Sequence, residues 1–152
     1  MQLSRSAYVL LPAQQVFDLI EHAEHYPEFL PWCLEASILE RHEHFVRARV
    51  GFGYAALHSH FHAHVDKRPP TGMDVHIEGW PFELFKGEWQ IQPIGDKGCR
   101  TTFTVRCDIQ DPLWDQVLSL AAGFIADKLV DAFMQRARRI AAEQALKASS
   151  AA

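Results

Sequence analysis

Four histidines recur at every second residue in the segment His58-Ser-His-Phe-His-Ala-His64. Side chains of a β-strand alternate between its faces, so these imidazoles would share one face, about 6.7 Å apart. Two imidazoles at this spacing can bind one metal ion. The same alternation is typical of the solvent-facing side of a half-buried strand, with Phe61 and Val65 facing inward. Because no third ligand has suitable local spacing, we predict outward-pointing histidines and no metal site.

Aromatic side chains are the second group that could act together. The chain has ten Phe, four Trp and three Tyr among 152 residues, and they gather in 26–32, in 79–89 and on a segment after residue 112. Such side chains most often fill a core. Beside a helix that is apolar on several faces, they can instead line a cavity for a hydrophobic ligand. The candidate ligand contacts are Phe29, Trp32, Phe61, Trp80, Phe82, Phe85, Phe124 and Leu129.

Signatures of catalysis are missing from the sequence. It contains no GxSxG, no P-loop and no HExxH motif, and its carboxylates cannot be paired for acid–base work by spacing alone. We therefore predict a protein that is not an enzyme, with no catalytic residue and no cofactor. Its three cysteines, Cys33, Cys99 and Cys107, show no CxxC spacing, which favours a reducing compartment over a disulfide framework.

Charge limits the choice of partners. Fifteen Lys and Arg against nineteen Asp and Glu give a net charge of −4, which argues against DNA as a partner. A local cationic cluster could still contact phosphate. Its members would be Arg136, Arg138, Arg139 and Lys147, joined by Arg47 and Arg49. Basic residues near the end of a helix are also favoured by the helix dipole, so a purely structural role remains the alternative.

The elements that must position these residues follow from periodicity. Apolar residues alternate in 4–11, 45–52, 73–78 and 99–109, which predicts strands, and helical spacing in 13–22 predicts a short helix. A long helix is predicted over 112–146, with Asp111 as N-cap and Pro112 at its first position. Its first half is apolar on more than one face and must be covered. We predict an α+β fold: a curved antiparallel sheet of six to seven strands wrapped around this helix.

Length and hydropathy predict one domain over 1–146 and a frayed tail over 147–152. No segment has the roughly 20 continuous apolar residues that would span a bilayer, and no signal-peptide core follows the N-terminus. We expect a cytoplasmic protein, with peripheral contact at the inner membrane as the alternative.

Three segments carry a family resemblance. They are Tyr26-Pro-Glu-Phe-Leu-Pro-Trp-Cys33, the block from Gly79 to Trp89 containing Pro-Phe-Glu-Leu-Phe-Lys-Gly-Glu-Trp, and residues 124–137. In this order they resemble the START-like family that includes the coenzyme Q-binding proteins and the bacterial RatA proteins, within the polyketide cyclase/START superfamily. The likeness runs from about residue 3 to residue 141, and its first segment is the most specific.

The resemblance implies a helix-grip fold with a deep apolar cavity. It also implies two activities for such a chain. One is non-catalytic binding of ubiquinone or a similar isoprenoid lipid in support of respiratory electron transport. The other is binding of the large ribosomal subunit, which blocks subunit association. A polyketide cyclase-like enzyme shares the fold and is a third alternative. We favour the quinone as bound ligand, because the net charge is negative and the cationic cluster is modest.

Overall fold

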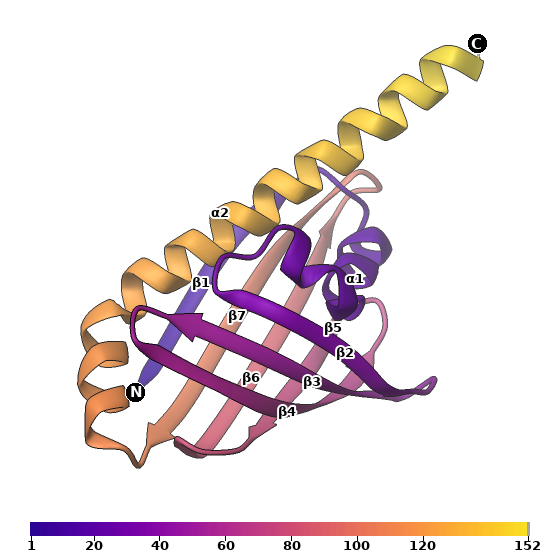
Figure 1. The fold of residues 1–152 in the computed structure, drawn as a ribbon. Coiled ribbons are helices and arrows are strands. Elements are labelled where there is room, and N and C mark those ends of the chain that lie inside the picture. The colour runs from indigo at the N-terminus through magenta and orange to yellow at the C-terminus, as the bar shows by residue number, and fades with distance from the viewer. Residues whose placement is uncertain (152) are drawn as a thin grey trace.

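Seven strands form one curved antiparallel sheet in the part of the chain that the computed structural model describes, residues 1–151. In chain order they are β1 (Gln2–Val9), β2 (Cys33–Arg41), β3 (Phe45–Tyr54), β4 (Leu57–Arg68), β5 (Gly72–Glu78), β6 (Phe82–Ile94) and β7 (Gly98–Ile109). Their order across the sheet is β1-β7-β6-β5-β4-β3-β2 (Figure 1). The predicted α+β class and antiparallel sheet are confirmed.

Helices occupy the two places where the chain leaves the sheet. Helix α1 (Ala13–Glu21) and the 3₁₀ helix η1 (Ala23–Glu28) connect β1 to β2, which are the two edge strands. Helix α2 (Pro112–Ala151) follows β7 and passes along the sheet beside β1, and α1 lies beneath the C-terminal half of α2 (Figure 1). Sheet and long helix together form the predicted helix-grip arrangement. No helix within residues 1–151 is long and apolar enough to cross a membrane.

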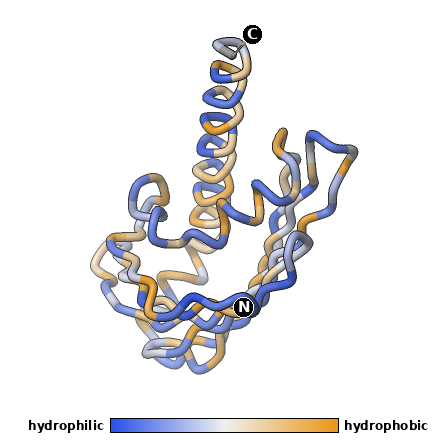
Figure 2. Tube along the Cα trace, turned by 90° about the vertical axis from the view of Figure 1, so that its right-hand side faces the viewer, coloured by the Kyte–Doolittle hydropathy of each residue, from blue (hydrophilic) through white to orange (hydrophobic). Residues whose placement is uncertain are grey.

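The N-terminus of α2 matches its prediction and the C-terminus does not. Asp111 Oδ1 accepts a hydrogen bond of 3.0 Å from the backbone N–H of Trp114, which is the contact that an N-cap makes. The helix continues past residue 146 to Ala151. Ala137 is its last fully buried residue, and residues 142–150 are all exposed. Figure 2 shows these last turns rising beyond the rest of the chain.

The two faces of the sheet divide the side chains as alternation predicts. On β4, Leu57 and Phe61 are buried, whereas His58, His60 and His62 are exposed. The fourth histidine of the run, His64, keeps 42 % of its side chain exposed. The register pairs Phe61 with Val50 and His60 with Gly51 of β3, so the apolar residues of neighbouring strands share the inner face.

The buried apolar residues form two clusters rather than one. The larger lies between α1, the inner face of the sheet and the middle of α2, around Phe17, Met73 and Ala137. The smaller joins Leu57 and Phe61 of β4 to Trp114 in the first turn of α2. Because α2 contacts the sheet near both clusters, the space between them is bounded by helix on one side and sheet on the other.

Candidate functional site

A cavity of about 420 Å³ lies between α2 and the inner face of the sheet. Inward-facing residues of the strands form its wall, and residues of α1, the η1–β2 segment and α2 cover it. Few of the lining residues are polar. The period-two pattern of the strands thus builds one continuous apolar surface under the long helix.

Five of the eight predicted ligand contacts lie in this lining: Trp32, Phe61, Phe82, Phe85 and Leu129. The aromatic rings among them make a connected group, with ring centroids 5.1 Å apart for Phe61 and Phe82 and 5.2 Å apart for Phe82 and Phe85. These centroid distances are those of favourable edge-to-face and tilted aromatic pairs. The structure therefore brings β4 and β6 aromatics together at one end of the cavity.

The other three predicted ligand contacts, Phe29, Trp80 and Phe124, are not among the described residues that line the cavity. Phe29 packs edge-on against Phe133 at 5.4 Å, below the guanidinium of Arg136. Trp80 is 52 % exposed and packs on the edge of another tryptophan. Phe124 is 54 % exposed, with its ring centroid 6.0 Å from that of Trp32. Trp32 does line the cavity, so Phe124 lies at its rim.

Other aromatic residues line the cavity without having been among the predicted contacts. Trp89 of β6 stacks on Phe103 of β7 with centroids 4.5 Å apart, and Phe133 of α2 packs edge-on against Trp89 at 5.4 Å. The register pairs Trp89 directly with Phe103. Alternation on the predicted strand 99–109 already placed Phe103 on the inner face, which is the signal that could have identified it.

Polar groups in the lining are few and mostly satisfied by protein partners. The Tyr26 hydroxyl donates to the carbonyl of Ile20, and burial raises the pKa of Tyr26 far above its usual value. Glu21 accepts from Lys67 Nζ at 2.7 Å and lies 3.7 Å from Arg41 Nε. Because only 7 % of the Lys67 side chain is exposed, this ion pair is shielded from water and ties α1 to β4.

Arginine 5 is the other charged residue of the lining. It points inward from the edge strand β1, and its Nε donates to Asp127 Oδ1 of α2 at 2.8 Å. Its Nη1 donates to the carbonyl of Ser4 at 3.0 Å. Its Nη2 lies beside Gly123, close to where a side chain on that residue would begin. The guanidinium thus bridges β1 and α2 at the border of the cavity.

None of the three thiols is prepared to act as a nucleophile at neutral pH. Cys33 lines the cavity, and burial raises its pKa to about 11. Burial also raises the pKa of Cys99 and of Cys107, although the Thr101 hydroxyl lowers the first and the N-terminal charge lowers the second in part. A thiolate is the reactive form of cysteine, and these surroundings disfavour it.

The histidines occupy the outer face, away from the cavity. His62, His64 and His76 line a second hollow there with Glu40 and Glu78. Within residues 1–151, no three His, Cys, Asp or Glu side chains come together as a group that could hold a metal ion. That the run His58–His64 binds no metal ion stays a prediction from its sequence spacing.

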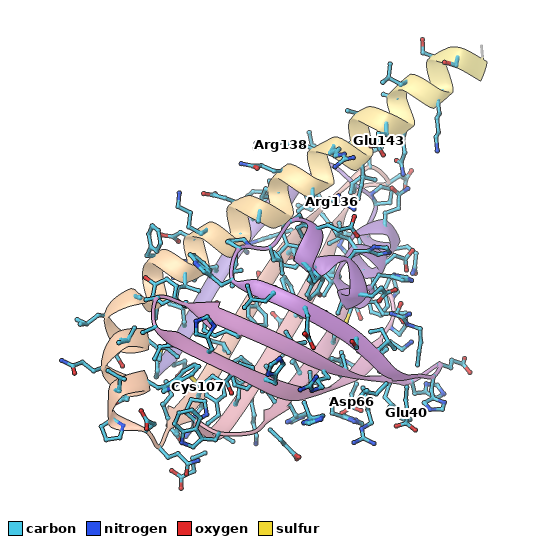
Figure 3. All side chains as sticks on the ribbon, in the orientation of Figure 1. Glu40, Asp66, Cys107, Arg136, Arg138 and Glu143 are labelled. Atoms are coloured by element: carbon cyan, nitrogen blue, oxygen red, sulfur yellow. The ribbon has the colours of Figure 1, made fainter. Side chains whose placement is uncertain are left out.

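The predicted cationic cluster is divided over two surfaces, and most of its members have acidic partners. Arg47 and Arg49 lie on the outer face of β3, where they pair with Glu40 and Glu35. On α2, Arg136 pairs with Glu28 and Arg139 with Glu143. Within the described residues 1–151, Arg138 and Lys147 make no ion pair. Figure 3 shows Arg138 on the side of α2 that faces away from the sheet.

The fold and its apolar cavity define a START-like, helix-grip protein. The chain belongs to the family described as polyketide cyclase / dehydrase and lipid transport, which its residues 9–134 match.

Two relatives differ in what their names describe. The "Ribosome association toxin RatA" of Pseudomonas aeruginosa is 33 % identical over 138 residues, which cover 91 % of this chain and 96 % of that one. The "Coenzyme Q-binding protein COQ10 homolog B, mitochondrial" of Xenopus laevis is 22 % identical over 156 residues, covering 99 % of this chain and 64 % of that one.

Solved structures confirm the fold alone, because their sequence identity to this chain is low. The Zhui aromatase/cyclase of Streptomyces sp. R1128 superposes with a TM-score of 0.82 at 14 % identity, over 91 % of this chain and 94 % of that one. A START superfamily protein from Mycobacterium smegmatis superposes with a TM-score of 0.78 at 16 % identity, over 91 % and 98 % of the two chains. The START-like resemblance recognised in the sequence is confirmed.

Proposed function

We propose that this chain binds a hydrophobic ligand of the ubiquinone type, or a similar isoprenoid lipid, in the cavity under α2 and does so without catalysis. The observation that carries the proposal is the 420 Å³ cavity with its almost wholly apolar lining. A cavity of this size falls within the range of known ligand sites. Aromatic rings at both of its ends offer faces and edges for a planar ring.

The expected affinity is moderate. A ligand that buries about 300 Å² of apolar surface gains roughly 7 kcal/mol from leaving water. Association and ordering costs reduce this gain, so we expect dissociation constants of the order of micromolar. The protein would act in the cytoplasm and meet its ligand at the surface of the inner membrane.

A pair of aromatic-to-acid variants tests the proposal. Phe82→Asp places a carboxylate in the cavity wall, whereas Tyr8→Asp makes a comparable change at a residue that is 68 % exposed on β1. We expect Phe82→Asp to abolish binding of a short-chain quinone and Tyr8→Asp to leave it intact. Circular dichroism checks that both variants fold. Equal quinone binding by the folded Phe82→Asp variant and the wild type would refute the proposal.

Ribosome association is the second candidate function. The specific observation in its favour is the 33 % identity to a RatA protein over nearly the whole of both chains. Cationic side chains would contact ribosomal RNA, and Arg138 with Lys147 at the end of α2 are the members of the cluster without acidic partners in residues 1–151. Binding through phosphate contacts weakens steeply as salt increases.

Sedimentation with large ribosomal subunits at increasing salt separates the two functions. The variant Arg138→Glu with Arg139→Glu changes the helix surface and leaves the cavity lining untouched. Salt-sensitive binding that this variant loses and Phe82→Asp keeps would make ribosome association the leading function. A cyclase-like activity is a third alternative, but the likeness to an aromatase/cyclase is at 14 % identity and extends to the fold only.

A further inference from the structure

Two polar side chains interrupt the apolar inner face of the sheet at neighbouring positions. Arg5 of β1 lies opposite Phe103 of β7, and Ala7 lies opposite Thr101. Arg5 and Thr101 therefore occupy diagonal positions on one face, where side chains start about 7–8 Å apart. Both line the cavity.

The hydrogen-bonding capacity of these two residues is not used up by the protein. Thr101 is 8 % exposed, and within residues 1–151 the one hydrogen-bond partner of its hydroxyl is the sulfur of Cys99, at 3.6 Å, which is a weak partner. The guanidinium of Arg5 uses Nε and Nη1 for Asp127 and Ser4. Its Nη2 has no protein acceptor within residues 1–151. By contrast, Glu21, the other charged residue of the lining, is engaged by two cations.

An aromatic pair adjoins this polar position. The register continues from Arg5 to Phe103 and on to Trp89, and these two rings are stacked with an interplanar angle of 26°. A planar head group at this point would have aromatic carbon on one side and hydrogen-bond donors at its edge. The rest of the lining extends toward Phe61 and Phe82 and offers only apolar contact for a chain.

We propose that Arg5 and Thr101 form a head-group subsite, which binds the carbonyl oxygens of a neutral, planar head while the apolar chain lies along the β4–β6 aromatics. This inference rests on the proposed ligand binding and adds to it the orientation of the ligand and the chemistry that selects it. A neutral head is favoured over a carboxylate because Asp127 already balances the charge of Arg5 at 2.8 Å. A second anion would have to displace Asp127 or be repelled by it.

Three ligands with ten-carbon chains test the subsite on the full-length chain. Decylubiquinone carries carbonyl oxygens, decanoate carries a carboxylate, and decylbenzene carries a ring with no oxygen. Displacement of the neutral dye N-phenyl-1-naphthylamine measures all three in one assay. For the wild type we expect decylubiquinone to bind more tightly than decylbenzene and than decanoate.

Substitutions at the subsite should affect only the oxygen-bearing head. Arg5→Met keeps the side-chain stem, and we expect it to weaken decylubiquinone about tenfold while decylbenzene is unchanged. Thr101→Val keeps the shape within β7 and should cost about threefold for the quinone. Asp127→Asn should raise the affinity for decanoate. The matched control is Arg106→Met, the same change on the outer face of β7, which should alter none of the three affinities.

The outcomes separate this inference from the function on which it rests. If none of the three ligands displaces the dye from the wild-type protein, the proposed ligand binding is refuted, and the head-group subsite is refuted with it. If the wild type binds the quinone and Arg5→Met keeps the wild-type ratio of quinone to decylbenzene affinity, the subsite alone is refuted. If decanoate binds more tightly than the quinone, the argument for a neutral head is wrong.

Discussion

The buried ion pair between Lys67 and Glu21 leads to a prediction about how α1 is held against β4. Lys67 points inward from β4, and its Nζ lies 2.7 Å from Glu21 Oε1 of α1, with exposed fractions of 7 % and 12 % for the two side chains. Lys67→Met removes the cation and keeps most of the side-chain volume. The carboxylate of Glu21 is then left in an apolar setting without its nearest partner.

The size of the effect follows from what remains around Glu21. Removing one partner of a buried pair typically costs about 3–5 kcal/mol. Here Arg41 Nε stays 3.7 Å from the same carboxylate and compensates part of the lost attraction. We therefore expect the free energy of unfolding to fall by about 2 kcal/mol. With a urea m-value of about 2 kcal/mol/M for a chain of this size, the midpoint should fall by about 1 M.

Urea denaturation followed by far-ultraviolet circular dichroism measures this midpoint. Arg68→Met is the matched control, because the next residue carries a cation on the outer face that is 46 % exposed and pairs with Asp74. Exposed pairs contribute about 0–1 kcal/mol, so its midpoint should stay within about 0.5 M of the wild type. The double variant Lys67→Met with Glu21→Gln should recover part of the loss, since it leaves no unpaired charge. Equal midpoints for Lys67→Met and Arg68→Met would refute the assignment of this pair as a buried support of α1.

Three further predictions concern capping, pH and thiol reactivity. Asp111→Ala removes the acceptor for the backbone N–H of Trp114 and should lower the free energy of unfolding by about 1 kcal/mol, whereas Asp111→Asn should cost clearly less; equal urea midpoints for all three proteins would contradict this. Burial alone would raise the pKa of Glu24, but the hydrogen bond and charge of Arg41 outweigh it and lower the pKa below its usual 4.5. The stabilisation is thus present above pH 4.5 and lost as pH falls through the lowered pKa, so Arg41→Gln should cost about 0.5–1 kcal/mol more at pH 7 than at pH 2, where its hydrogen bond to the Glu21 carbonyl still counts; a cost that does not change with pH would refute it. Because its pKa is about 11, Cys33 should react with a disulfide reagent at pH 8 about a hundredfold more slowly than a free thiol, and more slowly still with a quinone bound; a rate equal to that of free cysteine would contradict the burial argument.

Much of the fold could be predicted because alternation and capping are local signals. The faces of β4 followed from the histidine run, and the start of α2 followed from Asp111 and Pro112. The first strand spans Gln2–Val9 rather than 4–11, since β1 begins with its pairing to Arg106 of β7. Pairing across a hundred residues leaves no mark in the local pattern.

The cavity was only partly predictable for the same reason. A strand pattern tells which aromatic residues point inward, and so Phe61 could be placed on the inner face. It does not tell which inward residues α2 covers, and Trp80 and Phe124 instead lie largely exposed. The charged residues of the lining were missed, because Arg5 and Glu21 are bound by partners on other elements, which the spacing of residues does not reveal.

The part of α2 that extends beyond the sheet should unfold locally more readily than the rest of the helix. Up to Ala141 the helix packs on the rest of the chain, but residues 142–150 are all exposed. Within these nine residues, one side chain bonds to another element: Gln144 Nε2 donates to Gln15 Oε1 of α1 at 2.7 Å. Extending an existing helix needs no new nucleus, yet each exposed turn adds little free energy. Amide hydrogens up to Ala137 should therefore exchange only when the whole protein unfolds, whereas those of 142–150 should exchange by fraying, far faster. The two parts of one continuous helix then differ strongly in their free energy of local unfolding. A fusion partner joined to the exposed part would leave the cavity undisturbed.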